Sequence, residues 1–313
     1  MPNPDNFTQL PTPRVRYLDL LSRAVAYIDS HLAEPLNGDM LAEHAAMSRF
    51  HFHRVFRAYF GTTVAGYVTW RRLQRACELL AANPDSVLDV ALAVGYDSAQ
   101  ALAKAMRREL DTTPTAIRAG ERPAWQRLFD RRPSPPPDGD DLMLKPQMID
   151  LPELHVLTAT GRGMDGGNMS RAAQQAFGEL IPALESAGLM PRMKSCIALF
   201  PDEPQGLEDQ QTRMLAGAVF DYSLLERSGA VARPGLPLKG SLAWYTHPAG
   251  RYAVFTYVGP YTELHLAWTG VYRDWLPATG YALRDVPPFE HYVSNPCDTP
   301  PAQLRTDLYV PLQ

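Results

Sequence analysis

The sequence has little of what marks membrane, secreted or metal-binding proteins. Its three cysteines, Cys77, Cys196 and Cys297, lie too far apart for a zinc site or a disulfide framework, which fits a reducing cytoplasm. No run of about eighteen apolar residues occurs, so we expect no membrane-spanning helix. The N-terminus has no basic start followed by an apolar stretch, so we expect no signal peptide.

Signatures of catalysis are also lacking. No Ser-His-Asp, metal-ligand or phosphate-loop pattern occurs, and the glycine-rich segment 161–168 lacks the spacing of a dinucleotide-binding loop. We therefore expect no catalytic residue, no cofactor and no metal.

The charge is distributed unevenly along the chain. The formal net charge is -4, yet residues 14–132 hold 17 basic and 13 acidic side chains, whereas residues 133–313 hold 13 and 20. A basic first half beside an acidic second half indicates that the first half contacts a polyanion.

A proline-rich break divides the chain. Residues 130–141, DRRPSPPPDGDD, contain four prolines and four acids, which is typical of a stiff linker rather than a packed element. The 313 residues suffice for two hydrophobic cores. We predict an all-α domain over residues 14–120, a linker over 121–145 and an α+β domain over 146–313.

A short helix, a tight turn and a longer basic helix occur twice before the break. In the first copy, a helix over 39–46, capped by Asp39, precedes a helix that begins after Ser48 and ends at Gly61. The second copy ends in a helix over 98–110. Helix–turn–helix units that contact DNA are built in this way.

The stretch SRFHFHRVFRAYFG, residues 48–61, is the second helix of the first unit. His51 and His53 lie two residues apart, so they point in different directions on a helix and cannot chelate one ion. One side carries the apolar stripe Phe52, Val55, Phe56, Tyr59 and Phe60, and the opposite side carries Phe50, His53, Arg54 and Arg57. The opposite side is either an ordinary solvated face or a DNA-reading face, and an exposed Phe50 favours contact with a thymine methyl.

The helix over 98–110 turns polar residues outward. Gln100 suits adenine, and Lys104 and Arg107 suit guanine, although a plain amphipathic helix would look the same. A long helix over 64–82, which Asn83-Pro84 ends, would hold the two units so that they enter successive major grooves about 34 Å apart. The DNA contacts that we predict are Ser48, Arg49, Phe50, His53, Arg54, Arg57, Ser98, Gln100, Lys104 and Arg107.

After the break the pattern changes to strands rich in Val, Thr and aromatic residues. HVLTATG, SCIALF and AGAVF, with a helix after the first, parallel YAVFTYVG, EHYV and DLYVPL, with an extra strand over 241–246. We expect two related strand–helix–strand–strand halves whose sheets join, and the alternative is a single α/β domain without a repeat.

An acid with aromatic neighbours is predicted in the second domain. Strand alternation points Glu290 and Tyr292 the same way, and helical spacing places Trp268, Tyr272 and Trp275 on one side of a helix. Rings around a carboxylate suit an organic cation. The alternatives are a solvated glutamate and three aromatic residues of an ordinary core.

The segment LAEHAAMSRFHFHRVFRAYFGTTVAGYVTWRRLQRACELL, with SVLDVALAVGY and MRRELDTTP after it, resembles the AraC/XylS-type DNA-binding domain over about residues 17–118. The resemblance implies that bases are read by Phe50, His53 and Arg54, and in the second unit by the positions Ala99, Gln100, Ala103 and Lys104, with Ser98 on the DNA backbone. Because Ala99 and Ala103 are small, we expect the first unit to give most of the specificity and the second mainly phosphate affinity.

The segments AGRYAVFTYVGPYTELHLAWTGVYRDWLPATGY, PPFEHYVSNPCDTPP and RTDLYVPL resemble the GyrI-like, or bacterial effector-binding, domain. The resemblance implies a two-fold repeat of strand–helix–strand–strand units and a site for bulky, often cationic molecules. It assigns Glu290 as the acid of that site, with Trp268, Tyr292 and Tyr309 as aromatic walls, and the helical spacing adds Tyr272.

The two halves together predict a one-component transcription regulator. Its expected partners are promoter DNA, a small hydrophobic or cationic effector and RNA polymerase, with no membrane. We expect a cytoplasmic, nucleoid-associated monomer or homodimer. Two alternatives stay open: the second domain hydrolyses a reactive ligand with Glu290 as general base, or it contacts only other proteins.

Overall fold

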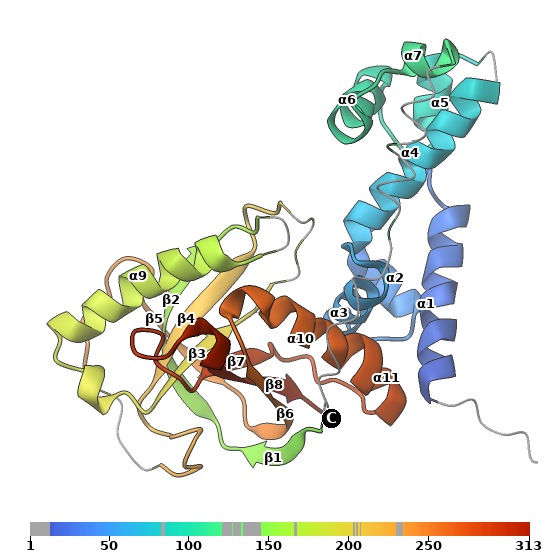
Figure 1. Cartoon of the computed structure of the whole chain (residues 1–313). Coiled ribbons are helices and arrows are strands. Elements are labelled where there is room, and N and C mark those ends of the chain that lie inside the picture. The colour runs from blue at the N-terminus through green and yellow to red at the C-terminus, as the bar shows by residue number, and fades with distance from the viewer. Residues whose placement is uncertain are drawn as a thin grey trace, which may run out of the picture.

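A helical region and a sheet region lie against each other in the computed structural model (Figure 1). The structure describes residues 13–82, 85–120, 127, 133, 145–165, 168–202, 204, 206, 208–229 and 234–313, and only the backbone of residues 13–16 and 50. The predicted Asn83-Pro84 stop lies outside the described residues, as does the predicted linker 121–145 except for residues 127, 133 and 145. No helix in these ranges is long and apolar enough to span a membrane.

The helical region contains the two predicted helix–turn–helix units, α2–α3 and α5–α6, joined by the long helix α4 (Figure 1). Its elements are α1 Pro13–Ser30, α2 Gly38–His44, α3 Arg49–Phe60, α4 Val64–Ala82, α5 Val87–Ala93, α6 Ala99–Leu110 and α7 Pro114–Arg118. The first unit lies beside the sheet region, whereas α4 carries the second unit away from it (Figure 1).

The ends of these helices follow the local sequence, with one correction. Gly61 ends α3 in the left-handed conformation, at φ 66°, and the Ser98 hydroxyl caps α6 by accepting from the Ala101 amide. The prediction that Asp39 caps α2 is wrong. Asn37 is the cap, because it has the extended backbone that a cap needs and its side chain accepts from the Met40 amide.

The two units have separate hydrophobic cores. The first surrounds Phe56 of α3, whose ring centroid lies 4.5 Å from that of Phe60 and 5.4 Å from that of Tyr67. This core continues into the sheet region, where Val271 and Leu276 belong to the same buried cluster. The second unit packs around Leu102, Met106 and Leu110 of α6 in a cluster that takes no residue from the sheet region.

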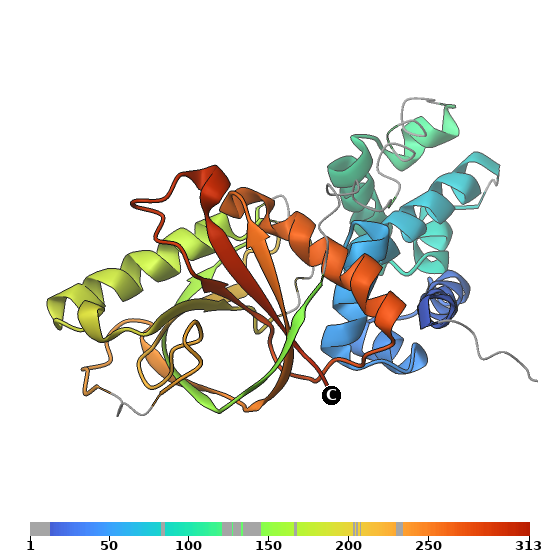
Figure 2. The same cartoon turned by 60° about the horizontal axis from the view of Figure 1, so that its bottom comes forward.

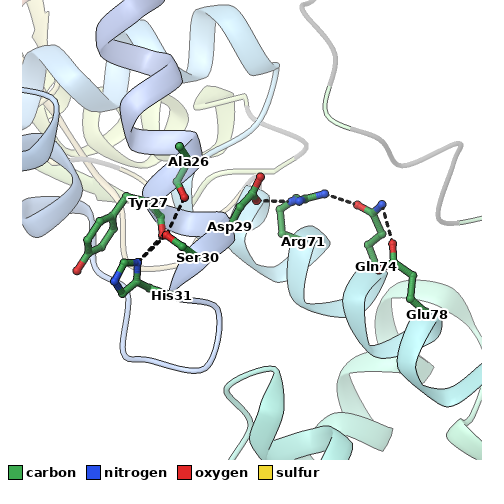
Figure 3. A network of polar contacts seen from close by, with 8 residues as sticks. All are labelled: Ala26, Tyr27, Asp29, Ser30, His31, Arg71, Gln74 and Glu78. Atoms are coloured by element: carbon green, nitrogen blue, oxygen red, sulfur yellow. Dashed lines mark hydrogen bonds and ion pairs between the residues drawn. The ribbon is translucent and has the colours of Figure 1, made fainter. Parts of the chain in front are cut away.

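Polar contacts fasten α1 to α4 (Figure 3). Asp29 of α1 accepts from Nε of Arg71 at 2.5 Å, Arg71 donates to Gln74 at 2.7 Å, and Gln74 donates to Glu78 at 3.2 Å. Of these contacts, only that between Asp29 and Arg71 joins the two helices, and a partly exposed pair of this kind contributes little stability.

Within the described residues, eight antiparallel strands form one sheet in the order β1-β6-β8-β7-β3-β4-β2-β5. The strands are β1 Gln147–Leu151, β2 Leu154–Arg162, β3 Ser195–Leu199, β4 Arg213–Val219, β5 Ala243–His247, β6 Gly250–Val258, β7 Phe289–Tyr292 and β8 Arg305–Pro311. The helices are α9 Ser170–Ser186, α10 Leu264–Gly270, the π-helical turn η3 Val271–Trp275 and α11 Leu276–Thr279, with short turns η1 Met190–Arg192, η2 Tyr261–Glu263 and η4 Pro301–Gln303.

The order of the strands confirms the predicted repeat. The half β2-α9-β3-β4 and the half β6-α10-β7-β8 meet where β3 pairs with β7. The extra strand predicted over 241–246 is the edge strand β5. The opposite edge strand, β1, was not predicted, because its five residues bury only Ile149 and Leu151 and give a weak alternating pattern.

The sheet is strongly curled, and α9 and α10–α11 cover its outer face (Figure 2). Its inner face encloses a core formed by residues such as Tyr252, Phe289 and Tyr309. Neighbouring residues on a strand face opposite sides, so Phe289 lies inside the curl and Glu290 lies under the helices.

Candidate functional site

Glu290 lies on β7, at the seam where the two halves of the sheet meet. Its neighbour across the seam is Ala198 of β3, and its side chain is 4% exposed. One carboxylate oxygen accepts from Nε1 of Trp268 and the other from Oη of Tyr292, both at 2.8 Å. The prediction that Glu290 and Tyr292 point the same way is confirmed.

Aromatic rings from both covering helices surround this carboxylate. The Tyr272 ring stacks on Trp268 at 5.7 Å between centroids, with 10° between planes. The ring centroid of Tyr261, in η2 just before α10, lies 5.0 Å from that of Tyr292, and Phe177 of α9 meets Tyr292 edge-on at 5.7 Å. The site is therefore an acid at the base of an aromatic cluster between α9 and α10.

The electrostatics of the site follow from its burial. Burial raises the pKa of Glu290 above its ordinary value, and the hydrogen bonds from Trp268 and Tyr292 partly oppose that rise. In the part of the chain that the structure describes, Glu290 forms no ion pair. A buried carboxylate that accepts hydrogen bonds from two neutral donors has no positive charge beside it to neutralise its own. A cationic ligand would provide that charge.

Two aromatic residues of the prediction lie away from this cluster. Tyr309 pairs with Phe289 across β7 and β8 and stacks on it at 4.3 Å, inside the curl. It therefore faces away from Glu290, and we leave it out of the site. Trp275 packs edge-on against Phe255 at 4.9 Å, as an ordinary core residue would.

Phe177 and Tyr261 were not singled out from the sequence. The repeat was the signal that could have found Phe177, because two related halves place α9 beside α10 over the same face of the sheet. Tyr261 follows Gly259-Pro260, and only the turn that these residues make directs its ring toward Tyr292.

The predicted reading face of α3 is partly covered at the side chains that the structure describes. His53 is 9% exposed, because its ring lies against Gly38, where an added Cβ would be 2.2 Å from Nε2. Arg54 and Arg57 are half-buried, and Arg49 pairs with Asp39 at 3.0 Å. The expectation that this side points into solvent is therefore wrong for His53.

Two further predicted contacts lie in or before the first turn of α3. The side chain of Phe50 lies outside the described residues. Ser48 precedes the helix as its N-cap residue, yet its hydroxyl makes no capping hydrogen bond.

The reading face of α6 is open. Gln100, Lys104 and Arg107 are exposed, and Ser98 caps the helix. All three exposed side chains lie on the side opposite the buried Leu102 and Met106, as the sequence predicts.

Neither histidine of α3 is placed to bind a metal. Burial lowers the pKa of His51 and of His53 to about 4, so both rings are neutral near pH 7. Among the described residues, no group of three or more His, Cys, Asp or Glu side chains could hold a metal ion.

Comparisons with known proteins agree with this arrangement. Residues 41–120 match a helix-turn-helix domain, and residues 144–313 match the GyrI-like small molecule binding domain. Regulatory protein SoxS of Escherichia coli is 32% identical over 99 residues, 32% of this chain and 92% of SoxS. Right origin-binding protein of Escherichia coli is 30% identical over 107 residues, 34% of this chain and 36% of that protein. The DNA-binding domain of AdpA, solved with a target DNA, is 36% identical with a TM-score of 0.31, over 32% of this chain and 90% of that one.

Two helix–turn–helix units joined to a sheet domain with a buried acid define a regulator with a DNA-binding part and a small-molecule part. The second match takes in more than half of the chain, so the chain belongs to the GyrI-like small molecule binding domain family. Its helical region is of the AraC type, and the chain is a transcription regulator with an effector-binding domain. The named relatives give no support to the hydrolase alternative.

Proposed function

We propose that α3 and α6 contact promoter DNA and that the Glu290 cluster binds an apolar organic cation. The observation that carries the ligand class is the buried carboxylate of Glu290, whose oxygens accept from Trp268 and Tyr292 and meet no cation in the described residues. Aromatic faces attract a cation, and the carboxylate neutralises it. RNA polymerase as a partner and the monomeric or dimeric state stay predictions.

The residue roles follow from the chemistry of each helix. Arg54 can donate two hydrogen bonds to a guanine edge, which specifies a base pair. Exposed Lys104 and Arg107 supply charge to the phosphates, which adds affinity without specificity. We therefore assign sequence reading mainly to α3 and affinity mainly to α6.

A thermal-shift measurement with tetraphenylphosphonium, an apolar organic cation, tests the ligand half. We expect the probe to raise the melting temperature of the wild-type chain, because a ligand that binds only the folded state stabilises it. Glu290→Gln should lose this shift, whereas Glu185→Gln, an exposed acid on α9, should keep it. Equal shifts for all three proteins would rule out Glu290 as the cation partner. Mass spectrometry of the recovered probe distinguishes binding from turnover.

A further inference from the structure

The effector-binding domain and α3 share a tightly packed interface. Tyr59 of α3 donates a hydrogen bond to the carbonyl of Arg273 at 3.2 Å, and Tyr17 of α1 donates to the carbonyl of Tyr281 at 3.0 Å. The helix α3 packs on η3, and α1 packs on α11. Buried residues on both sides form one continuous apolar cluster.

Arg54 lies at the centre of this interface. It donates from Nη1 to the Tyr272 hydroxyl at 3.1 Å and from Nη2 to the Phe200 carbonyl at 3.3 Å. Its guanidinium carbon also lies 5.8 Å from the centroid of the Tyr272 ring. The two N–H groups that Arg54 donates to Tyr272 and Phe200 are not available to a guanine edge while these contacts last.

Docking of α3 in DNA and its contact with η3 also interfere for a steric reason. A recognition helix enters the major groove, which is about 12 Å wide, with its reading side against the bases. In this arrangement η3 contacts Arg54 at the edge of the predicted reading side and Tyr59 on the apolar side of α3. DNA and the effector-binding domain therefore compete for Arg54 and for the space beside it.

A short chain of contacts joins this interface to the ligand site. Arg54 donates to Tyr272, Tyr272 stacks on Trp268, and Trp268 donates to Glu290. Trp268 lies in the last turn of α10, which ends at Gly270 just before η3, the π-helical turn that carries Tyr272. Such turns are less regular than an α-helix and occur often at functional positions.

A cation that reaches Glu290 by moving Trp268 disturbs this chain. Glu290 is 4% exposed, and Trp268 and Tyr292 lie against its two oxygens, so a ligand can reach the carboxylate only when a neighbouring side chain moves. Moving Trp268 removes the surface on which Tyr272 is stacked, and Tyr272 is the residue that holds Arg54.

We propose that the structure is a closed state, in which the effector-binding domain holds Arg54 of α3, and that an organic cation at Glu290 opens it. This inference rests on the proposed function, since it joins the two sites named there. The coupling is expected to change DNA affinity about 5- to 150-fold, the usual range for two linked sites. By linkage, DNA should tighten binding of the cation by the same factor.

The experiment measures binding of the full chain to a DNA duplex selected from a random pool with tetraphenylphosphonium present. Tyr272→Phe removes the hydroxyl that accepts from Arg54 but keeps the ring that stacks on Trp268. Without the probe, this variant should bind DNA about 5- to 150-fold more tightly than wild type, and the probe should add little. The matched control is Tyr245→Phe on the edge strand β5, which should behave as wild type.

Tyr17→Phe is a second variant outside the Glu290 cluster, and it keeps the ring that lies 5.3 Å from His51 of α3. It removes the hydrogen bond to Tyr281, so it should also tighten DNA binding without the probe while leaving probe binding unchanged. The inference is overturned if both variants bind DNA as wild type does, or if the probe leaves wild-type DNA affinity unchanged or lowers it. Failure of the proposed function would look different, because then the chain would select no DNA or the probe would not stabilise it.

Discussion

The two helix–turn–helix units of this chain contain the same elements but have different surroundings. In the first, α3 lies against the effector-binding domain, and Arg54 donates to Tyr272 and Phe200. In the second, α6 has its own core, and Lys104 and Arg107 are exposed. The comparison shows that the helix proposed for general DNA affinity is open, whereas the helix proposed for sequence reading is partly covered.

Acidification should give the largest difference in stability between the two units. Burial lowers the pKa of His51 and His53 in α3, and of His247 and His291 in the sheet region, from 6.5 to about 4. Residues 64–120 contain no histidine. As the pH falls, these histidines are protonated at a higher pH in the unfolded chain than in the folded chain. The free energy of unfolding therefore has its full value above pH 6.5 and falls toward pH 4, by on the order of 3 kcal/mol for each histidine.

Hydrogen exchange, compared as protection factors at several pH values, checks this prediction. Protection should fall in α3 and the sheet region and persist in α5 and α6. An equal fall in α6 would contradict the assignment of the loss to buried histidines.

Core truncations should show which unit is joined to the effector-binding domain. Phe56→Ala should cost about 3–5 kcal/mol and Met106→Ala about 2–5 kcal/mol, because both side chains are fully buried. Since Phe56 lies in the core shared with the sheet region, its loss should also reduce protection there, whereas Met106→Ala should not. Urea titration followed by hydrogen exchange separates the two outcomes, and identical effects on the sheet region would argue against separate cores.

We expect the DNA roles of α3 and α6 to differ in kind. Arg54→Ala should cost about 1–3 kcal/mol on selected DNA and relax preference at one base pair. Lys104→Ala should weaken binding to all sequences alike and reduce the slope of log affinity against log salt concentration by about 1. The ratio of selected to scrambled DNA is the measurement, because any change in domain closure alters both affinities equally. A loss that is the same on both DNAs for Arg54→Ala would remove its base-reading role.

Glu290→Gln should give the smallest effect, which is an increase in the stability of the folded chain. A buried carboxyl whose pKa is raised above 4.5 makes the folded state less stable once the pH rises above 4.5. Gln keeps an acceptor for Trp268 and a donor for Tyr292 without the charge. The melting temperature should rise near pH 7, by about 2–4 °C for each kcal/mol gained, and the difference should vanish below pH 4.5. A variant that melts below wild type at neutral pH would contradict the cost assigned to this charge.

Local patterns in the sequence predicted most of the elements. The two helix–turn–helix units, the repeat of strand–helix–strand–strand and the shared direction of Glu290 and Tyr292 follow from spacing over a few residues. Two of the errors were also local in origin. The cap of α2 depended on backbone angles at Asn37, and β1 is too short to stand out.

The sequence by itself determined which side of α3 is apolar and which residues α6 exposes, because helical spacing alone sets them. Only the tertiary structure decided that Arg54 meets Tyr272 rather than solvent, since 218 residues separate the two along the chain. The same holds for Tyr309, which the register between β7 and β8 places inside the curl. Helix faces are set by neighbours three and four residues away, whereas domain contacts and strand register depend on packing between distant segments, which no local pattern encodes.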